Sequence, residues 1–118
     1  MTAELSAEDA KLVTLARATR ARVGAEQGAA VRDTDGRTYA AASVDLPSLQ
    51  LSALRVCVAM AISSGSQGLE AAVLLQPGDS DELLPADRDT LQDFAGHAVV
   101  VHLGDPRGTV AATVSSGD

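Results

Sequence analysis

The chain has 118 residues, the size of one domain, and we expect a single domain over residues 1–118. Hydrophobic residues make up 46% of it and charged residues 21%, a composition that supports a folded core and argues against disorder. The net charge of −7 opposes binding to phosphate backbones and anionic lipids, and Tyr39 and Phe94 alone cannot form a stacking platform for nucleic acid. We therefore expect neither a nucleic-acid nor a membrane partner.

Cysteine usage and the first residues indicate the compartment. Cys57 is the only cysteine, which excludes an internal disulfide and a zinc site built from several thiolates of one chain. Because it lies in an apolar segment, we interpret it as a small core residue. The first residues lack the basic and apolar regions of a secretion signal, and no apolar run approaches the roughly 20 residues of a membrane span. The sequence therefore predicts a cytoplasmic protein.

The first half of the chain predicts two helices separated by a hairpin. Ser6-Ala-Glu-Asp9 is interpreted as a capping box, in which the serine accepts hydrogen bonds from the first turn and the acid reaches back to the cap. Together with the apolar residues that follow at helical spacing, it predicts a helix over residues 6–23. Two short extended runs on either side of Asp35-Gly36 predict a β-hairpin. The second helix is predicted from Pro47 or Ser48 to Ser64. Because this helix is apolar round most of its circumference, it must be buried on most sides.

The second half of the chain predicts three strands and one more helix. The predicted elements are a buried strand over 69–75, an acidic loop over 78–82, a short helix over 88–95, and strands over 98–103 and 109–114. The resulting order is α-β-β-α-β-α-β-β. Strands that alternate with helices indicate a layered α/β fold with a mixed sheet.

Four short segments point to a known family. They are Gly28-Ala-Ala-Val31, Asp35-Gly-Arg-Thr-Tyr39, Ser43-Val-Asp45 and the stretch over residues 51–65. Together with the order of elements, they resemble the small homotetrameric cytidine deaminases over nearly the whole chain. The resemblance implies a three-layer α/β/α fold with a mixed five-stranded sheet, a homo-oligomer that is a tetramer, and a pyrimidine nucleoside as the ligand class.

The motifs that carry the family's chemistry are altered in this chain. In the family, one helix opens with Cys-Ala-Glu-Arg and the next with Pro-Cys-x-x-Cys; the cysteines hold a zinc ion that activates water, and the Glu transfers protons. Here Ser52-Ala-Leu-Arg55 and Pro85-Ala-Asp-Arg88 stand in those places, so Leu54 replaces the acid. The family's ribose-binding Phe-Asn-x-Glu corresponds to Ala42-Ser-Val-Asp45, which keeps Ser43 and Asp45 as an eroded ribose site. The resemblance therefore implies no metal, no cofactor and no catalytic residue.

Two functions follow from these substitutions. The first is a catalytically inactive protein that acts through assembly or interaction with a protein partner. The alternative is binding of a pyrimidine nucleoside, or residual cytidine deaminase activity.

An arginine survives beside the altered motif. In the family, the arginine after the catalytic Glu offsets the charge of the zinc thiolates, and here it remains as Arg55 without them. Because an unpaired buried guanidinium is costly, we expect Arg55 to pair with Asp87, Asp89 or Asp45. The rival expectation is that the helix has rotated and Arg55 reaches solvent.

Other candidate sites favour plain structural interpretations. His97 and His102 are five residues apart around a predicted strand, so their side chains point to opposite faces and do not share a metal ion. We interpret both as surface or interface histidines. The cluster of Arg17, Arg20 and Arg22 is interpreted as a solvated helix face that could also serve a subunit contact.

Overall fold

The computed structural model describes residues 5–78 and 81–118, and its middle layer is a five-stranded mixed sheet in the order β2-β1-β5-β6-β7. The β5–β6 pair is parallel, and β1–β2, β1–β5 and β6–β7 are antiparallel. The strands are β1 (Gly28–Asp33), β2 (Thr38–Ala42), β5 (Leu69–Leu75), β6 (Val100–Gly104) and β7 (Val110–Ser115).

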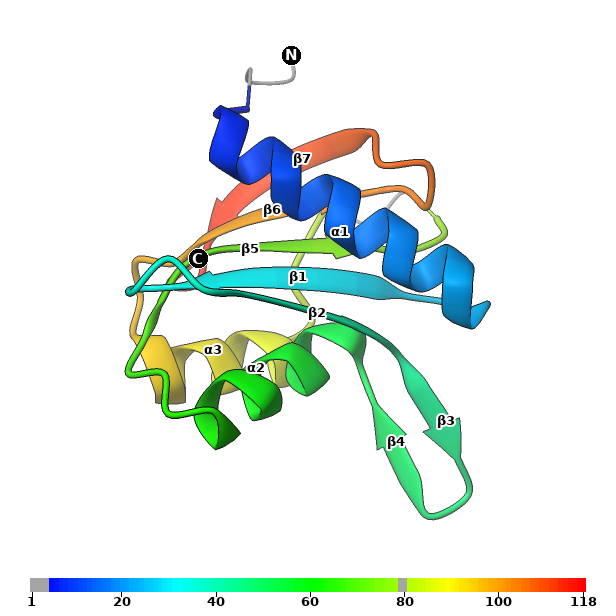
Figure 1. Ribbon diagram of the computed structural model, residues 1–118, viewed down its shortest axis with the longest axis horizontal. Helices are drawn as coiled ribbons and strands as arrows, with labels where there is room; N and C mark the ends of the chain where they lie inside the picture. Colours follow the sequence, from blue (N-terminus) through cyan, green and yellow to red (C-terminus); the bar gives the residue numbers. More distant parts are fainter. Residues whose placement is uncertain (1–4, 79–80) are drawn as a thin grey trace.

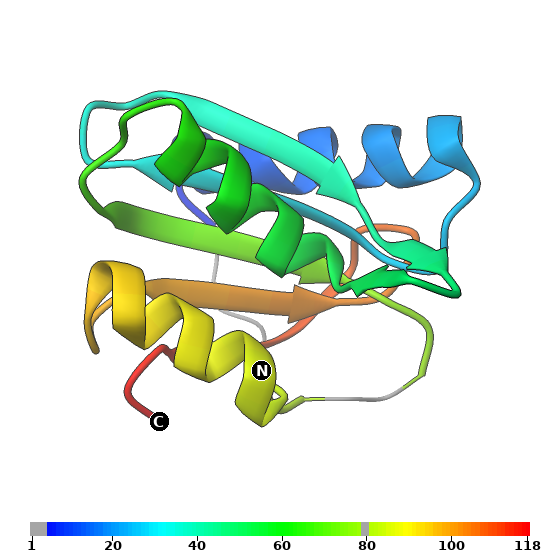
Figure 2. The ribbon, with the colours of Figure 1, turned by 90° about the horizontal axis from the view of Figure 1, so that it is seen from below.

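Three helices cover the two faces of the sheet. α1 (Ala7–Val23) lies on one face, and α2 (Ala53–Ser63) and α3 (Pro85–Ala95) lie side by side on the other (Figures 1 and 2). The larger buried cluster fills the space under α2 and α3, and a smaller one lies under α1. The predicted three-layer α/β/α fold with a mixed five-stranded sheet is confirmed.

The first helix is capped as predicted, but its acidic residue has a different role. Ser6 Oγ accepts a hydrogen bond from the Asp9 backbone N–H at 3.1 Å. The Asp9 carboxylate turns to the sheet instead of returning to the cap, and lies 3.0 Å from Arg32 Nη1 and 2.8 Å from His102 Nε2. His102 is only 5% exposed, so its interpretation as a surface histidine is wrong, whereas His97 is exposed.

A glycine sets how closely α1 approaches the sheet. A Cβ atom on Gly28 would lie 2.4 Å from the carbonyl oxygen of Ala16 in α1. Real Cβ atoms essentially never come that close to another heavy atom, so only glycine lets the helix rest directly on β1. Near the C-terminal end of the helix, Arg17 and Arg22 are exposed, whereas Arg20 is half-buried and donates a hydrogen bond from Nε to the Glu26 carbonyl oxygen at 2.9 Å. The interpretation as a solvated face therefore holds for Arg17 and Arg22 but not for Arg20.

The predicted hairpin forms around Asp35-Gly36 and is stabilised by a buried acid. Asp33 Oδ1 accepts hydrogen bonds from the backbone N–H groups of Asp35 and Arg37, and Oδ2 accepts one from the Ser66 hydroxyl. The hydrogen bond from Ser66 and those from the backbone lower the pKa of Asp33. Burial raises this pKa, but its effect is smaller than that of the hydrogen bonds.

A second hairpin, which the sequence did not predict, separates β2 from α2. Its strands β3 (Val44–Leu46) and β4 (Leu49–Leu51) pair with each other and project from the body of the molecule (Figure 1). The predicted helix start at Pro47 or Ser48 is therefore wrong, and α2 begins at Ala53. The fixed φ of proline suits a turn as well as a helix start, so the local signal was ambiguous.

The third helix begins earlier than the sequence predicts. α3 begins at Pro85 rather than at residue 88, because proline is tolerated in the first helical turn. Of the predicted acidic loop, residues 79 and 80 lie outside the described part of the chain. In the described part, no helix combines the length and the apolar character needed to cross a membrane.

Candidate functional site

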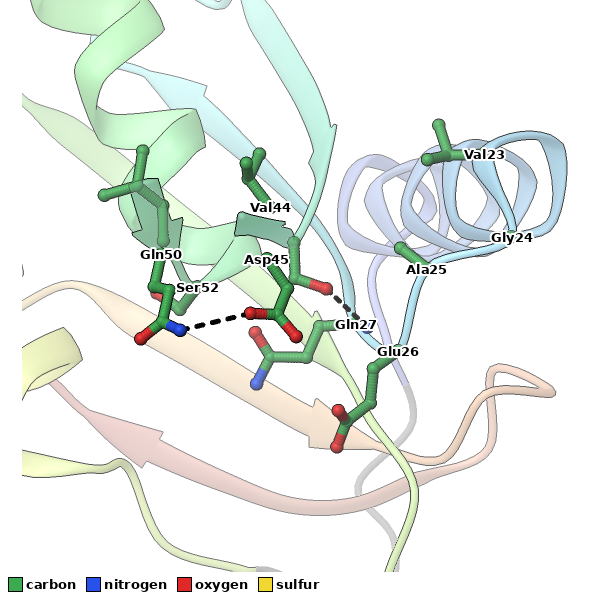
Figure 3. Close-up of a pocket in the computed structure, with 11 residues that line it drawn as sticks. Val23, Gly24, Ala25, Glu26, Gln27, Val44, Asp45, Gln50 and Ser52 are labelled. Carbon is green, nitrogen blue, oxygen red and sulfur yellow. Dashed lines mark hydrogen bonds between the residues drawn. The ribbon is translucent and has the colours of Figure 1, made fainter. Parts of the chain in front are cut away.

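A cavity of about 650 Å³ lies where the end of α1 and the start of β1 meet the β3–β4 hairpin and the N-terminus of α2 (Figure 3). It contains three of the residues singled out from the sequence: Ser43, Asp45 and Ser52. The other lining residues are Val23, Gly24, Ala25, Glu26, Gln27, Val44, Gln50 and Leu51. The structure thus brings Ser43 and Asp45, which the resemblance aligns with a ribose motif, to the same cavity as Ser52, which it aligns with a zinc cysteine.

The charged and polar groups of the cavity suit a neutral, hydroxyl-rich ligand. Asp45 is exposed, and its Oδ1 accepts a hydrogen bond from Gln50 Nε2 at 3.3 Å (Figure 3). Glu26 contributes a second exposed carboxylate. Among the described residues that line the cavity there is no lysine or arginine, so the wall opposes a phosphate group.

Gln27 positions the helix at the back of this cavity. Its Oε1 accepts a hydrogen bond from the Ala53 N–H at 3.0 Å, and its Nε2 donates to Gln76 Oε1 at 2.8 Å. Its backbone N–H donates to Ser43 Oγ at 3.0 Å, which explains the place of Ser43. Sequence reasoning missed Gln27 because its partners lie far along the chain, and its position directly before β1 was the one available signal.

Ser52 and Asp87 connect the N-terminal ends of two helices. Ser52 is the N-cap of α2, and its Oγ accepts a hydrogen bond from the Arg55 N–H at 3.2 Å. The same oxygen is hydrogen-bonded to Asp87 Oδ1 at 2.5 Å. Asp87 lies in the first turn of α3 and is 1% exposed. Burial raises the pKa of Asp87, while the Ser52 hydrogen bond and the charge of Arg55 oppose that rise.

The remaining predicted site residues lie apart from this contact. Leu54 is fully buried in the core under α2 and α3. Asp89 is exposed on α3. Arg55 is also exposed, and within residues 5–78 and 81–118 it makes no ion pair with Asp45, Asp87, Asp89 or another carboxylate. The expected Arg55 ion pair is therefore not formed, because the α2 turn directs its guanidinium to solvent and Asp87 pairs with Ser52 instead.

Ser52 and Asp87, which lie where the resemblance expects zinc ligands, do not fit a zinc ion. Zinc in proteins takes about four ligands from Cys, His, Asp or Glu. Ser52 Oγ and Asp87 Oδ1 are hydrogen-bonded to each other, and they are only two of the four ligands that zinc needs. No group of three or more His, Cys, Asp or Glu that could hold a metal occurs in the described part of the chain.

Cys57 takes no part in the site. Its side chain is fully buried in the core, with Sγ 3.6 Å from the Tyr39 carbonyl oxygen. Burial raises the pKa of this thiol to about 12. The interpretation of Cys57 as a small core residue is confirmed.

Comparison with known proteins agrees with this architecture. Residues 5–108 match the family model described as cytidine deaminase-like. The structure is similar to cytidine deaminase from Burkholderia pseudomallei, with a TM-score of 0.82, 21% identity, and coverage of 97% of this chain and 95% of that one. Cytidine deaminase from Mycobacterium leprae gives a TM-score of 0.72 and 22% identity, with 95% of each chain covered.

A third solved structure, cytidine deaminase from Bacillus anthracis, has a TM-score of 0.68 and 14% identity over 94% of this chain and 84% of that one. At these identities the solved structures establish the fold. No curated protein sequence is significantly similar to the chain. Because the family model spans most of its length, the chain belongs to the cytidine deaminase-like family.

Proposed function

We propose that this protein is a catalytically inactive cytidine deaminase-like protein that acts in the cytoplasm through assembly or interaction with a protein partner. The observation that carries the proposal is the Ser52–Asp87 hydrogen bond at the position that the resemblance gives to the zinc cysteines. Deamination of cytidine needs a metal-activated water and a carboxyl group that moves protons. Leu54, at the place of that carboxyl group, is hydrocarbon and lies in the core.

We expect the purified protein to contain no stoichiometric zinc and to deaminate neither cytidine nor deoxycytidine. Loss of general acid/base transfer alone typically costs about 10²–10⁴ in rate, and the activated water is lost as well. Metal analysis by mass spectrometry after preparation in metal-free buffer checks the first expectation, and an absorbance assay of both nucleosides checks the second. Zinc bound near Ser52, or turnover that a Ser52→Ala or Asp45→Ala change abolishes, contradicts the proposal.

A homotetramer is the form of assembly that we propose. Large apolar side chains are exposed on the α2 side of the sheet: Leu46 and Leu49 on the β3–β4 hairpin are 54% and 47% exposed, and Ile62 on α2 and Leu84 at the start of α3 are 52% and 54% exposed. Val56 and Met60 on α2 are only half-buried against the core. Exposed large apolar side chains favour burial in an interface, and closed symmetry is the usual form of a homo-oligomer.

Light scattering at micromolar concentration is expected to give about four times the 12.0 kDa chain mass. Ile62→Asp places a charge in the proposed interface and is expected to lower that mass. Leu15→Asp is the matched control, because Leu15 is 36% exposed on α1, on the opposite face of the sheet. A monomer mass for the unchanged protein, or an equal fall in mass for both variants, contradicts this assembly.

Binding of a pyrimidine nucleoside without turnover is the second candidate function, and the cavity at Asp45 and Ser52 favours it. Its volume of about 650 Å³ is within the range of small-molecule sites, roughly 300–1,000 Å³. Calorimetric titration with cytidine and uridine tests it, and Asp45→Ala is expected to weaken binding. Asp89→Ala, outside the cavity lining, should leave the affinity unchanged. Absence of heat with both nucleosides at millimolar concentration eliminates this candidate.

A further inference from the structure

Ser52 forms part of the cavity wall and contacts Asp87 behind it. A serine hydroxyl can accept two hydrogen bonds and donate one. The Arg55 N–H donates to Ser52 Oγ and so uses one acceptor position. The direction of the second bond, to Asp87 Oδ1, therefore decides what Ser52 offers to a ligand.

The surroundings of Asp87 favour its carboxyl group as the donor in that bond. The residue is 1% exposed, and Oδ2 is buried with no hydrogen-bond partner in the described part of the chain. A carboxylate ion there would leave a charged oxygen both buried and unpaired, which costs more than an unpaired neutral carbonyl oxygen. The positive charge of Arg55 opposes protonation, but its side chain is exposed to solvent, which weakens that effect.

We propose that Asp87 donates its carboxyl hydrogen to Ser52, so that Ser52 directs its own hydroxyl hydrogen into the cavity and selects a ligand with a hydrogen-bond acceptor there. Both acceptor positions of Ser52 are then occupied, by Arg55 N–H and by Asp87. Asp87 is in this sense a positioning residue that acts through Ser52. The inference rests on the nucleoside-binding candidate described above.

The chemistry of the cavity assigns the ligand's orientation and type. Ribose hydroxyls are donors that suit the carboxylates of Glu26 and Asp45, which leaves the base for the Ser52 end. In the proposed orientation the 4-position of the base faces Ser52, where a 4-oxo pyrimidine such as uridine presents an acceptor and the 4-amino group of cytidine presents a second donor. The site should therefore prefer uridine to cytidine.

The test is calorimetric titration of uridine and cytidine from pH 5 to pH 8, where both nucleosides keep one protonation state. At the acid end, uridine is expected to bind about tenfold more tightly, the usual effect of one mismatched hydrogen bond. As Asp87 ionises, Ser52 turns its hydrogen to the carboxylate and the preference should fall. Asp87→Asn can donate an amide hydrogen at every pH, so it should keep the preference and lose the pH dependence.

Two further variants separate this role from a merely structural one. Ser52→Ala should bind both nucleosides with equal affinity, and the exposed Asp89→Asn should reproduce the unchanged protein at every pH. Equal affinities in the unchanged protein, a preference for cytidine throughout, or an unchanged pH profile in Asp87→Asn overturns the inference.

Failure of nucleoside binding itself can be distinguished from failure of this inference. If neither nucleoside binds, the nucleoside-binding candidate is discarded, and the direction of the Ser52–Asp87 bond is judged in the ligand-free protein. Carbon-13 NMR of the Asp87 carboxyl group should then show titration above the usual aspartate range, which lies near a pKa of about 3.9. Titration at or below that range overturns the inference.

Discussion

Replacing Leu54 with glutamate will destabilise the protein by about 4 kcal/mol or more, and it will not restore deamination. The substitution returns the residue type that the resemblance places there, but Leu54 is fully buried in the core under α2 and α3. A carboxylate at that position is either ionised without a partner or neutral at the cost of a raised pKa, and both lower the free energy of unfolding. Urea unfolding followed by circular dichroism measures the loss.

Leu54→Met is the matched control, because a swap of similar volume in a core usually costs less than about 1.5 kcal/mol. If Leu54→Glu unfolds at the same urea concentration as Leu54→Met, the environment of this residue is polar and the described core is wrong. Deaminase activity in a folded Leu54→Glu protein would contradict the conclusion that Ser52 and Asp87 do not fit a zinc ion.

Replacing Asp9 with alanine is expected to lower the free energy of unfolding by about 3 kcal/mol at neutral pH. Asp9 and Arg32 are only 15% and 14% exposed, so the change leaves the guanidinium of Arg32 largely buried without its nearest anion. His102 also loses the partner of its Nε2, while its Nδ1 keeps the hydrogen bond to Thr113. Thermal unfolding should show a fall in Tm on the order of 10 °C.

The effect of Asp9→Ala should disappear in acid. Burial alone would raise the pKa of Asp9, but hydrogen bonds from His102 and Arg32 outweigh it, so the pKa is lowered. A carboxylate with a lowered folded-state pKa contributes stability above its unfolded pKa of about 3.9, and that stability is lost as the pH falls through the folded value. The unchanged protein and the variant should therefore converge once the pH lies below the lowered folded-state pKa of Asp9.

Glu8→Ala is the control for Asp9, because Glu8 lies in the same helical turn and faces solvent. Its contact with Lys11 is 3.8 Å long, and both side chains are more than half exposed. Exposed pairs of this kind contribute roughly 0–1 kcal/mol. An equal loss of stability in both variants would mean that the charge of the helix terminus, rather than the contacts with Arg32 and His102, determines the effect.

The sequence by itself determined the layered α/β architecture of this protein and the absence of a zinc site built from three cysteines of one chain. Hydrophobic periodicity, the Ser6 cap and the turn at Asp35-Gly36 are local signals, so they located the three helices and the strands of the main sheet. Composition is independent of geometry, so one cysteine was enough to exclude a three-thiolate zinc site within one chain. The burial of Cys57 followed from its apolar neighbours.

Only the tertiary structure decided which distant residues meet. The β3–β4 hairpin replaced the expected start of α2, because Pro47 suits a turn and a helix start equally well. Asp9 contacts His102, which is 93 residues away, and Ser52 contacts Asp87, which is 35 residues away. Such contacts depend on the angles at which helices pack on the sheet, and a linear pattern of residues carries no direct record of those angles.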